Sequence, residues 1–210
     1  MKTLSPALAL ALTATASADL INGGFEEYPA SGYSYFSGGS PYSGWATTAL
    51  DNTIEIWSNG TEGVFAYEGN AFAELNAFVP STLYQVVGGL PTSTSVNWHF
   101  AHRGRFGLDT MRLTITDLGA NGIFDSGTGD DTTLFTNLFS ADTSGWQVHY
   151  GSVNTIGGDV RFAFEAVSAA GGPSIGNLID WCGFGTNVVP APGAIVLLAF
   201  GSLLTVRRRA

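Results

Sequence analysis

The chain has 210 residues, of which 28 are glycine and one is cysteine, and seventeen acidic residues outnumber eight basic ones. The single cysteine, Cys182, excludes an internal disulfide, and we expect it to pack as a small buried hydrophobe. The net charge of −9 excludes nucleic-acid binding, which needs clustered basic residues, and leaves divalent cations and neutral sugars as natural partners.

The first eighteen residues carry the ordered features of a secretory signal peptide. Lys2 precedes an apolar run that ends at Leu12, and Ala16–Ala18 forms a small-residue cleavage site. The run is too short to span a bilayer core of about 30 Å permanently. We therefore predict that residues 1–18 are an N-terminal signal helix, with an ordinary first helix as the alternative.

The body, residues 19–187, is long enough for one domain with a hydrophobic core. It contains all seventeen acidic residues but only four basic ones, all arginine, so its formal charge is −13. Several segments alternate apolar and polar residues with period two, and glycine-rich turns separate them. This pattern predicts an all-β sandwich. The predicted strands cover Thr53–Trp57, Ala71–Asn76, Leu83–Val87, Val96–His102, Met111–Thr116, Trp146–Tyr150, Val160–Ala166 and Leu178–Phe184.

Six aromatic residues of the body are candidates to stack on the apolar faces of sugar rings: Trp45, Trp57, Trp98, Trp146, Tyr67 and Tyr84. Aromatic side chains also dominate sandwich cores, so at least half of these should be buried. Trp45 and Trp57 lie near the ends of predicted loops. We expect these two to be exposed and to contact a ligand.

The basic cluster of the body is formed by His102, Arg103 and Arg105. Strand alternation places His102 at an interior position, where we expect a hydrogen-bonded core histidine. The two arginines are expected either to pair with carboxylates such as Glu74 or Asp109, or to form a polar clamp for a sugar.

Oxygen ligands are concentrated in a glycine-rich loop after one predicted strand, where Asp117, Asn121 and Asp125 precede Asp130 and Asp131. Ca²⁺ prefers about six to eight oxygen ligands, which flexible acidic loops supply. The loop is therefore a candidate calcium site, and a solvated acidic hairpin loop is the alternative.

The two ends of the body resemble those of galactose-binding-like jelly rolls, a class that includes many carbohydrate-binding modules. The resemblance is carried by Asn22–Glu26 followed by Trp45, and by Gly176–Asp180 near the end of the body. It implies a jelly-roll sandwich in which Glu26 and Asp180 help to bind one structural Ca²⁺.

The tail, residues 188–210, has a proline motif, an apolar stretch and a basic end. A helix that begins after the prolines would be about 21 Å long, and its basic end should stay on the cytoplasmic side, so that the body lies outside. We predict a short C-terminal transmembrane helix. The residues that define this tail are Val189, Pro190, Pro192, Arg207, Arg208 and Arg209.

This tail resembles the PEP-CTERM sorting signal of bacterial envelopes. The resemblance implies recognition and cutting by an exosortase-type membrane protease, and an association with exopolysaccharide. A plain C-terminal anchor is the alternative, so membrane anchoring is expected to be either transient or permanent.

These features predict an exported, non-enzymatic protein of the cell envelope or extracellular matrix with the ability to bind exopolysaccharide. Its other partners would be the secretion machinery and an exosortase-like protease. The segment Gly172–Gly176 matches the G-x-S-x-G pattern, but no histidine follows His149 and a strand is predicted after the serine, so a serine-hydrolase elbow is excluded. A structural surface subunit without glycan binding and a secreted polysaccharide hydrolase are the alternatives.

Overall fold

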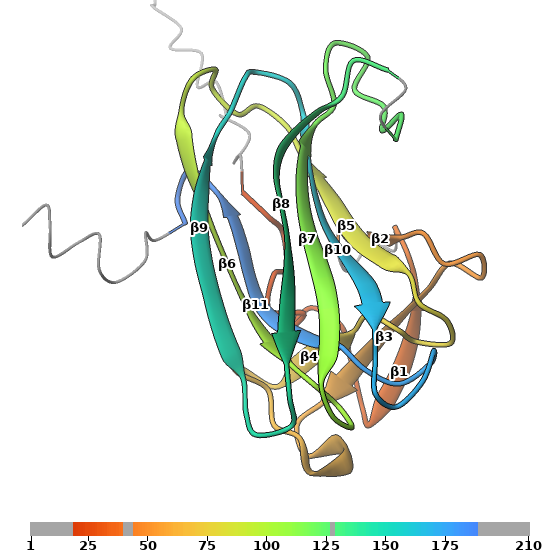
Figure 1. The fold of residues 1–210 in the computed structure, drawn as a ribbon. Coiled ribbons are helices and arrows are strands. Elements are labelled where there is room, and N and C mark those ends of the chain that lie inside the picture. The colour runs from red at the N-terminus through yellow and green to blue at the C-terminus, as the bar shows by residue number, and fades with distance from the viewer. Residues whose placement is uncertain (1–18, 40–43, 127–128, 189–210) are drawn as a thin grey trace, which may run out of the picture.

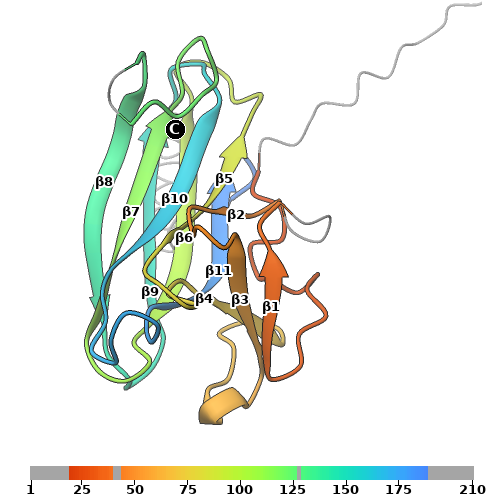
Figure 2. The same cartoon turned by 90° about the vertical axis from the view of Figure 1, so that its right-hand side faces the viewer.

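A computed structural model describes residues 19–39, 44–126 and 129–188 of the chain. These residues form two antiparallel sheets that pack face to face, as Figure 1 and Figure 2 show from two sides, so the predicted all-β sandwich is confirmed. The predicted signal helix, C-terminal helix and sorting motif lie outside the described residues. Within the described part of the chain, no helix has the length and apolar character to cross a membrane.

Each sheet is built from strands that are distant in sequence. Sheet A contains, in spatial order, β1 (Tyr33–Ser37), β3 (Thr53–Ser58), β4 (Ala71–Glu74), β11 (Leu178–Gly185), β6 (Ser95–Arg103) and β9 (Gln147–Asn154). Sheet B contains β2 (Ala46–Thr47), β5 (Thr82–Val87), β10 (Val160–Ser168), β7 (Asp109–Asp117) and β8 (Thr132–Ala141). A short 3-10 turn, η1 (Thr61–Gly63), lies between β3 and β4.

The alternation seen in the sequence determines which side of each strand faces the core. In β7, Met111, Leu113 and Ile115 are fully buried, and in the neighbouring β10 Phe162 and Phe164 are fully buried as well. Burial of each such side chain contributes roughly 1.5–3 kcal/mol. A slip of one residue would turn the whole set towards solvent, so the pattern also specifies the strand register.

All eight predicted strands are present with shifted ends, and three strands were not predicted: β1, β2 and β8. The missed strand β8 lies at the edge of sheet B, where its side chains are only partly buried. Apolar residues therefore stand next to each other in it, as in Leu134-Phe135 and Leu138-Phe139, instead of alternating. A register irregularity against β7 adds to the departure from period two.

The outer faces of the two sheets differ in what covers them. On sheet A, the segment after β3 folds back, and a second apolar cluster forms from Trp57, Val64, Phe72 and Leu178. On sheet B, polar side chains line the outer face, and the β7–β8 loop (green, at the top of Figure 1) reaches over one end of it. Sheet B is therefore the face with room for a ligand across several strands.

Candidate functional site

Trp45 and Trp57 are completely buried, so the expectation that they are exposed is wrong. The Trp45 ring stacks on Phe25 at 5.4 Å between centroids, and its Nε1 donates a hydrogen bond to the Asn22 carbonyl at 3.0 Å. The Trp57 Nε1 donates to Glu55 Oε1 at 2.8 Å. Nearness to a loop end did not produce exposure, because the neighbouring segments fold over both rings.

Arg105 forms the ion pair that the sequence predicted with Glu74. Its Nη1 lies 3.0 Å from Glu74 Oε2, and its Nη2 lies 3.0 Å from Glu62 Oε1. Arg103, the last residue of β6, lies beside Asp142, whose pKa is lowered by hydrogen bonds from Ser144 and by the Arg103 charge. The structure thus assigns Arg105 to carboxylate pairing, and a sugar clamp formed by both arginines stays a prediction.

His102 and Cys182 have the roles expected from the sequence. His102 is fully buried, and its Nε2 lies 3.1 Å from Asn177 Oδ1. Burial lowers the pKa of His102 to about 4, so the ring is neutral at physiological pH. Cys182 is buried in the core, and burial raises the pKa of its thiol. Both side chains are structural.

Glu26 and Asp180 are the two candidate calcium ligands from the ends of the body. Both bind the backbone of one loop, residues 67–71. Asp180 Oδ2 accepts hydrogen bonds from the backbone N–H groups of residues 67 and 68 at 2.7 and 3.1 Å. Glu26 Oε1 accepts from the N–H groups of residues 70 and 71 at 2.7 and 2.8 Å. The first and last segments of the domain are therefore linked through one loop.

The loop passes so close to these carboxylates that one position requires glycine. Gly69 has a φ of +66°, and a Cβ at this position would collide with the Glu26 carboxylate. Burial raises the pKa of Asp180 to about 7, hydrogen bonds from the loop lower it, and the Glu26 charge adds to the increase. The two carboxylates repel each other, which is the arrangement that a divalent cation relieves.

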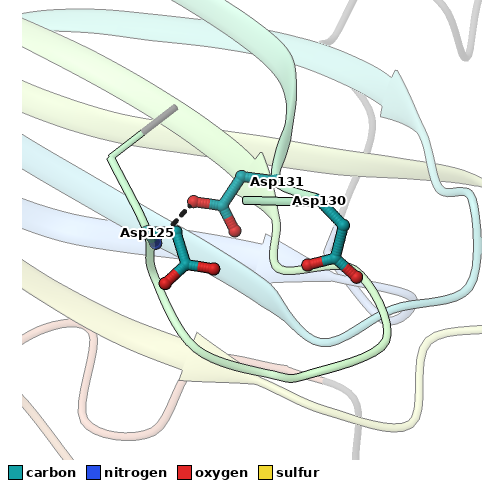
Figure 3. A group of neighbouring side chains, drawn as sticks. All are labelled: Asp125, Asp130 and Asp131. Carbon is teal, nitrogen blue, oxygen red and sulfur yellow. Dashed lines mark hydrogen bonds between the residues drawn. The ribbon is translucent and has the colours of Figure 1, made fainter. Parts of the chain in front are cut away.

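The acidic loop after β7 gathers a set of carboxylates that differs from the predicted one. Asp117 is buried and accepts hydrogen bonds from two backbone N–H groups at 3.0 and 2.9 Å. Asn121 Nδ2 donates to Asp125 Oδ2 at 2.8 Å. Oxygens of Asp125, Asp130 and Asp131 lie within 4.8 Å of one another. Figure 3 shows these three side chains on the same loop. Of the three predicted ligands, Asp125 belongs to this cluster.

A continuous groove crosses the outer face of sheet B. Three hollows of about 340, 220 and 250 Å³ follow one another from β5 to β8. Phe124 lines all three, Thr48 and Arg161 join the first to the second, and Thr114 joins the second to the third. The shared lining residues make these hollows one elongated site, of the size that ligand sites usually have.

Strand register explains where the groove lies. Tyr84, Ala163 and Thr114 stand side by side in one row across β5, β10 and β7. The neighbouring positions in β10 on the same face are Arg161 and Glu165, which have long side chains. Because Ala163 and Thr114 are small, the middle row forms a low floor between higher walls.

Arg161 is the central polar group of the groove. Its guanidinium carbon lies 4.2 Å from the centroid of the Tyr84 ring and 4.2 Å from that of Phe124, and the residue is 6% exposed. Two aromatic faces thus hold the cation by cation–π attraction. Burial lowers the pKa of Arg161, but a guanidinium stays charged. No acceptor among the described residues takes a hydrogen bond from it, so its N–H groups are available to a ligand.

Sequence reasoning named Tyr84 as a stacking candidate but missed Arg161 and Phe124. Alternation in β10 points Arg161 away from the core, so its outward position could have been read from the sequence. The position of Phe124 depends on how a long loop folds back over the sheet. No local pattern carries that information.

A scan of protein-family models finds no match to the chain, and a search among curated proteins finds none. The fold is similar to that of the C-terminal family 22 carbohydrate-binding module of Clostridium thermocellum Xyn10B, with a TM-score of 0.48 and 13% identity over 76% of this chain and 97% of that one. It is also similar to the CBM22-1 xylan-binding domain of Paenibacillus barcinonensis Xyn10C (TM-score 0.48, 13% identity, 76% and 94% covered). TmCBM61, solved with β-1,4-galactotriose, gives a TM-score of 0.45 and 18% identity over 79% and 95%. At these identities the similarity concerns the β-sandwich fold.

Proposed function

We propose that the protein is a non-enzymatic carbohydrate-binding protein and that the sheet B groove holds a segment of a glycan chain. The observation that carries this proposal is the groove of neighbouring hollows, whose lining combines aromatic rings with polar side chains. A sugar ring presents an apolar face and a rim of hydroxyl groups. A groove with both properties matches each side of such a ring.

The contacts available in the groove support this assignment. Phe124 is 43% exposed and gives a ring face for stacking. Arg161 supplies hydrogen-bond donors. The Thr48 hydroxyl accepts from the Thr82 N–H at 2.9 Å and the Thr114 hydroxyl lies 3.4 Å from that of Thr136, so each keeps part of its hydrogen-bonding capacity for a ligand. At one end, Arg112 Nη1 pairs with Glu165 Oε2 at 2.6 Å, which leaves further carboxylate lone pairs at the rim. Threonine and arginine donors suit hydroxyl or carboxylate groups of polysaccharides.

The groove is tested by isothermal titration with soluble neutral and uronic-acid-containing polysaccharides. We expect Phe124→Ala and Arg161→Leu each to weaken binding at least about ten-fold, because a lost ring contact or charge-assisted hydrogen bond contributes about 1.4 kcal/mol. Leu50→Ala is the matched control, since Leu50 is fully exposed outside the groove and should leave affinity unchanged.

Two results would contradict a glycan-binding groove. If the folded protein binds no polysaccharide and assembles with itself as its concentration rises, a structural surface subunit is the better description. If it cleaves a polysaccharide and loses this turnover when one acidic residue is replaced, the protein is a hydrolase.

We further propose that the protein acts outside the cytoplasm, at the cell envelope or in the extracellular matrix. The signal-peptide features, the sorting-type tail and the lysine-free acidic body support this setting. Mass spectrometry of the protein from its native host should show a mature N-terminus at Asp19 and a C-terminus trimmed within residues 188–210. Recovery of the uncut chain from the cytosol would contradict export.

We also propose that Glu26 and Asp180 bind one structural Ca²⁺. Removal of the ion with EDTA should lower the melting temperature by several degrees, because an ion at about 100 times its Kd stabilises by about 2.7 kcal/mol. Glu26→Gln should abolish the response to added Ca²⁺, whereas Asp130→Asn in the acidic loop should retain it. If instead Asp130→Asn abolishes the response and Glu26→Gln retains it, the calcium site lies in the acidic loop. A melting temperature that EDTA does not change would argue against a calcium site at either place.

A further inference from the structure

A second hollow of about 300 Å³ lies on the opposite sheet from the glycan groove. Tyr33 and Tyr35 come from β1, Glu55 from β3, and Phe78, Arg105 and Ile175 from the segments that follow β4, β6 and β10. It shares no lining residue with the sheet B groove. We refer to it as the β1 pocket.

One wall of the β1 pocket is aromatic and open to solvent. The rings of Tyr35 and Phe78 stack with centroids 4.9 Å apart and an angle of 24° between their planes. Tyr35 is 52% exposed and Phe78 is 51% exposed. These two residues come from distant parts of the chain, so the fold assembles an exposed aromatic surface here.

The pocket also contains a carboxylate that lacks a cationic partner. Glu55 is 3% exposed, its Oε1 accepts the hydrogen bond from Trp57, and no described residue donates to its Oε2. Glu55 therefore has acceptor capacity left for a ligand.

Arg105 does not fill this role, because it makes no hydrogen bond to Glu55 and four of its five N–H donors bind Glu62 and Glu74. Nη1 donates to both oxygens of Glu74, at 3.0 and 3.3 Å, and Nε and Nη2 donate to Glu62 at 3.2 and 3.0 Å. Two carboxylates thus bind one guanidinium. Burial raises the pKa of Glu55, while the Trp57 hydrogen bond and the Arg105 charge lower it.

We propose that the β1 pocket binds a protonated amine carried on a ring that has an apolar face, as in an amino-sugar unit or a simple cyclic amine. The ammonium group would donate to Glu55, and the ring would lie on Tyr35 and Phe78. A cation near an aromatic face and a charge-assisted hydrogen bond to a carboxylate reinforce each other. A neutral ligand would leave Glu55 without its counter-charge.

The test is titration calorimetry of the full chain at neutral pH with a glucosamine tetramer and with its N-acetylated counterpart, which has the same rings but no charge. We expect the charged tetramer to bind at least about ten-fold more tightly. Glu55→Gln should lose at least about ten-fold in affinity for it, whereas Leu50→Ala, at a fully exposed position that lines neither the β1 pocket nor the sheet B groove, should retain the affinity. Cyclohexylamine, added together with the charged tetramer, distinguishes the two kinds of ligand. If it competes with the tetramer, the pocket is a site for simple amines; if it does not compete, the pocket is a site for an amino-sugar chain.

Several outcomes would overturn this assignment. They are equal binding of both tetramers, no binding of either amine by the folded protein, and unchanged affinity in Glu55→Gln. Loss of tetramer binding in Phe124→Ala but not in Glu55→Gln would place the amine in the sheet B groove instead. If Glu55→Gln does not fold, the exposed pair Tyr35→Ala and Phe78→Ala replaces it, and retained affinity in both variants would equally exclude the β1 pocket.

Discussion

Arg105→Ala is expected to lower the free energy of unfolding by about 3–5 kcal/mol at alkaline pH, where Glu74 is ionised. The Glu74 side chain is completely buried, and Arg105 donates to both of its oxygens. Loss of the guanidinium leaves a buried negative charge whose remaining hydrogen bond comes from the Gly176 N–H at 2.6 Å. Urea unfolding of the variant and the parent protein measures the difference.

The same variant should show a characteristic dependence on pH. Burial raises the pKa of Glu74 to about 8 from its ordinary value of 4.5, so the folded protein keeps a proton that the unfolded chain releases. The contribution of this group to stability is therefore complete below about pH 4.5 and is lost as the pH rises through about 8. Protonated Glu74 needs no counter-charge, so the Arg105→Ala deficit should be smaller at about pH 5 than at about pH 9.

Arg112→Ala is the matched control for this prediction. Arg112 pairs with Glu165 at 2.6 Å, but both side chains are about two-fifths exposed, and such pairs contribute less than about 1 kcal/mol. If both arginine variants lose the same stability at both pH values, the Arg105–Glu74 pair does not behave as a buried charge pair.

Trp45→Ala is expected to lower the free energy of unfolding by about 3–5 kcal/mol without weakening glycan binding. The indole is fully buried between Phe25 and Phe164, and its removal leaves a cavity in the core and takes away one of the hydrogen bonds that the Asn22 carbonyl accepts. The melting temperature should fall by roughly 10 °C for a domain of this size. Differential scanning calorimetry and titration of the folded variant at low temperature separate stability from affinity.

Leu50→Ala is the control for this second prediction, because Leu50 is fully exposed and its loss should change stability by less than about 0.5 kcal/mol. A Trp45→Ala protein that melts normally but binds glycan poorly would restore Trp45 as a ligand contact. It would also contradict the buried position described above.

The strand pattern was readable from the sequence wherever a strand has one buried and one exposed face. In β7, for example, Met111, Leu113 and Ile115 are buried and the residues between them are partly exposed, because every second side chain enters the core. The edge strand β8 could not be recognised, since its side chains are only partly buried and do not need to alternate. Tryptophan exposure was misjudged for a related reason: sequence position near a turn says nothing about which segment folds over the ring.

The pairing of Arg105 with Glu74 was also predictable, because the body has few basic residues and many carboxylates. The interior place of His102 was predictable from strand alternation. The groove was not. Its walls combine Phe124, from a loop, with Tyr84 and Arg161 from different strands, and these residues meet only through sheet register. The β1 pocket likewise joins Tyr35 to Phe78 and Glu55 across separate elements.

The sequence by itself determined that the body is an acidic, lysine-free β domain with a core of alternating apolar residues, because composition and period-two patterning are local properties of the chain. Only the tertiary structure decided which aromatic residues are buried, which carboxylates have partners, and where the sheet B groove and the β1 pocket form. Those outcomes depend on contacts between residues far apart in sequence, and such contacts are set by strand order, register and loop folding together.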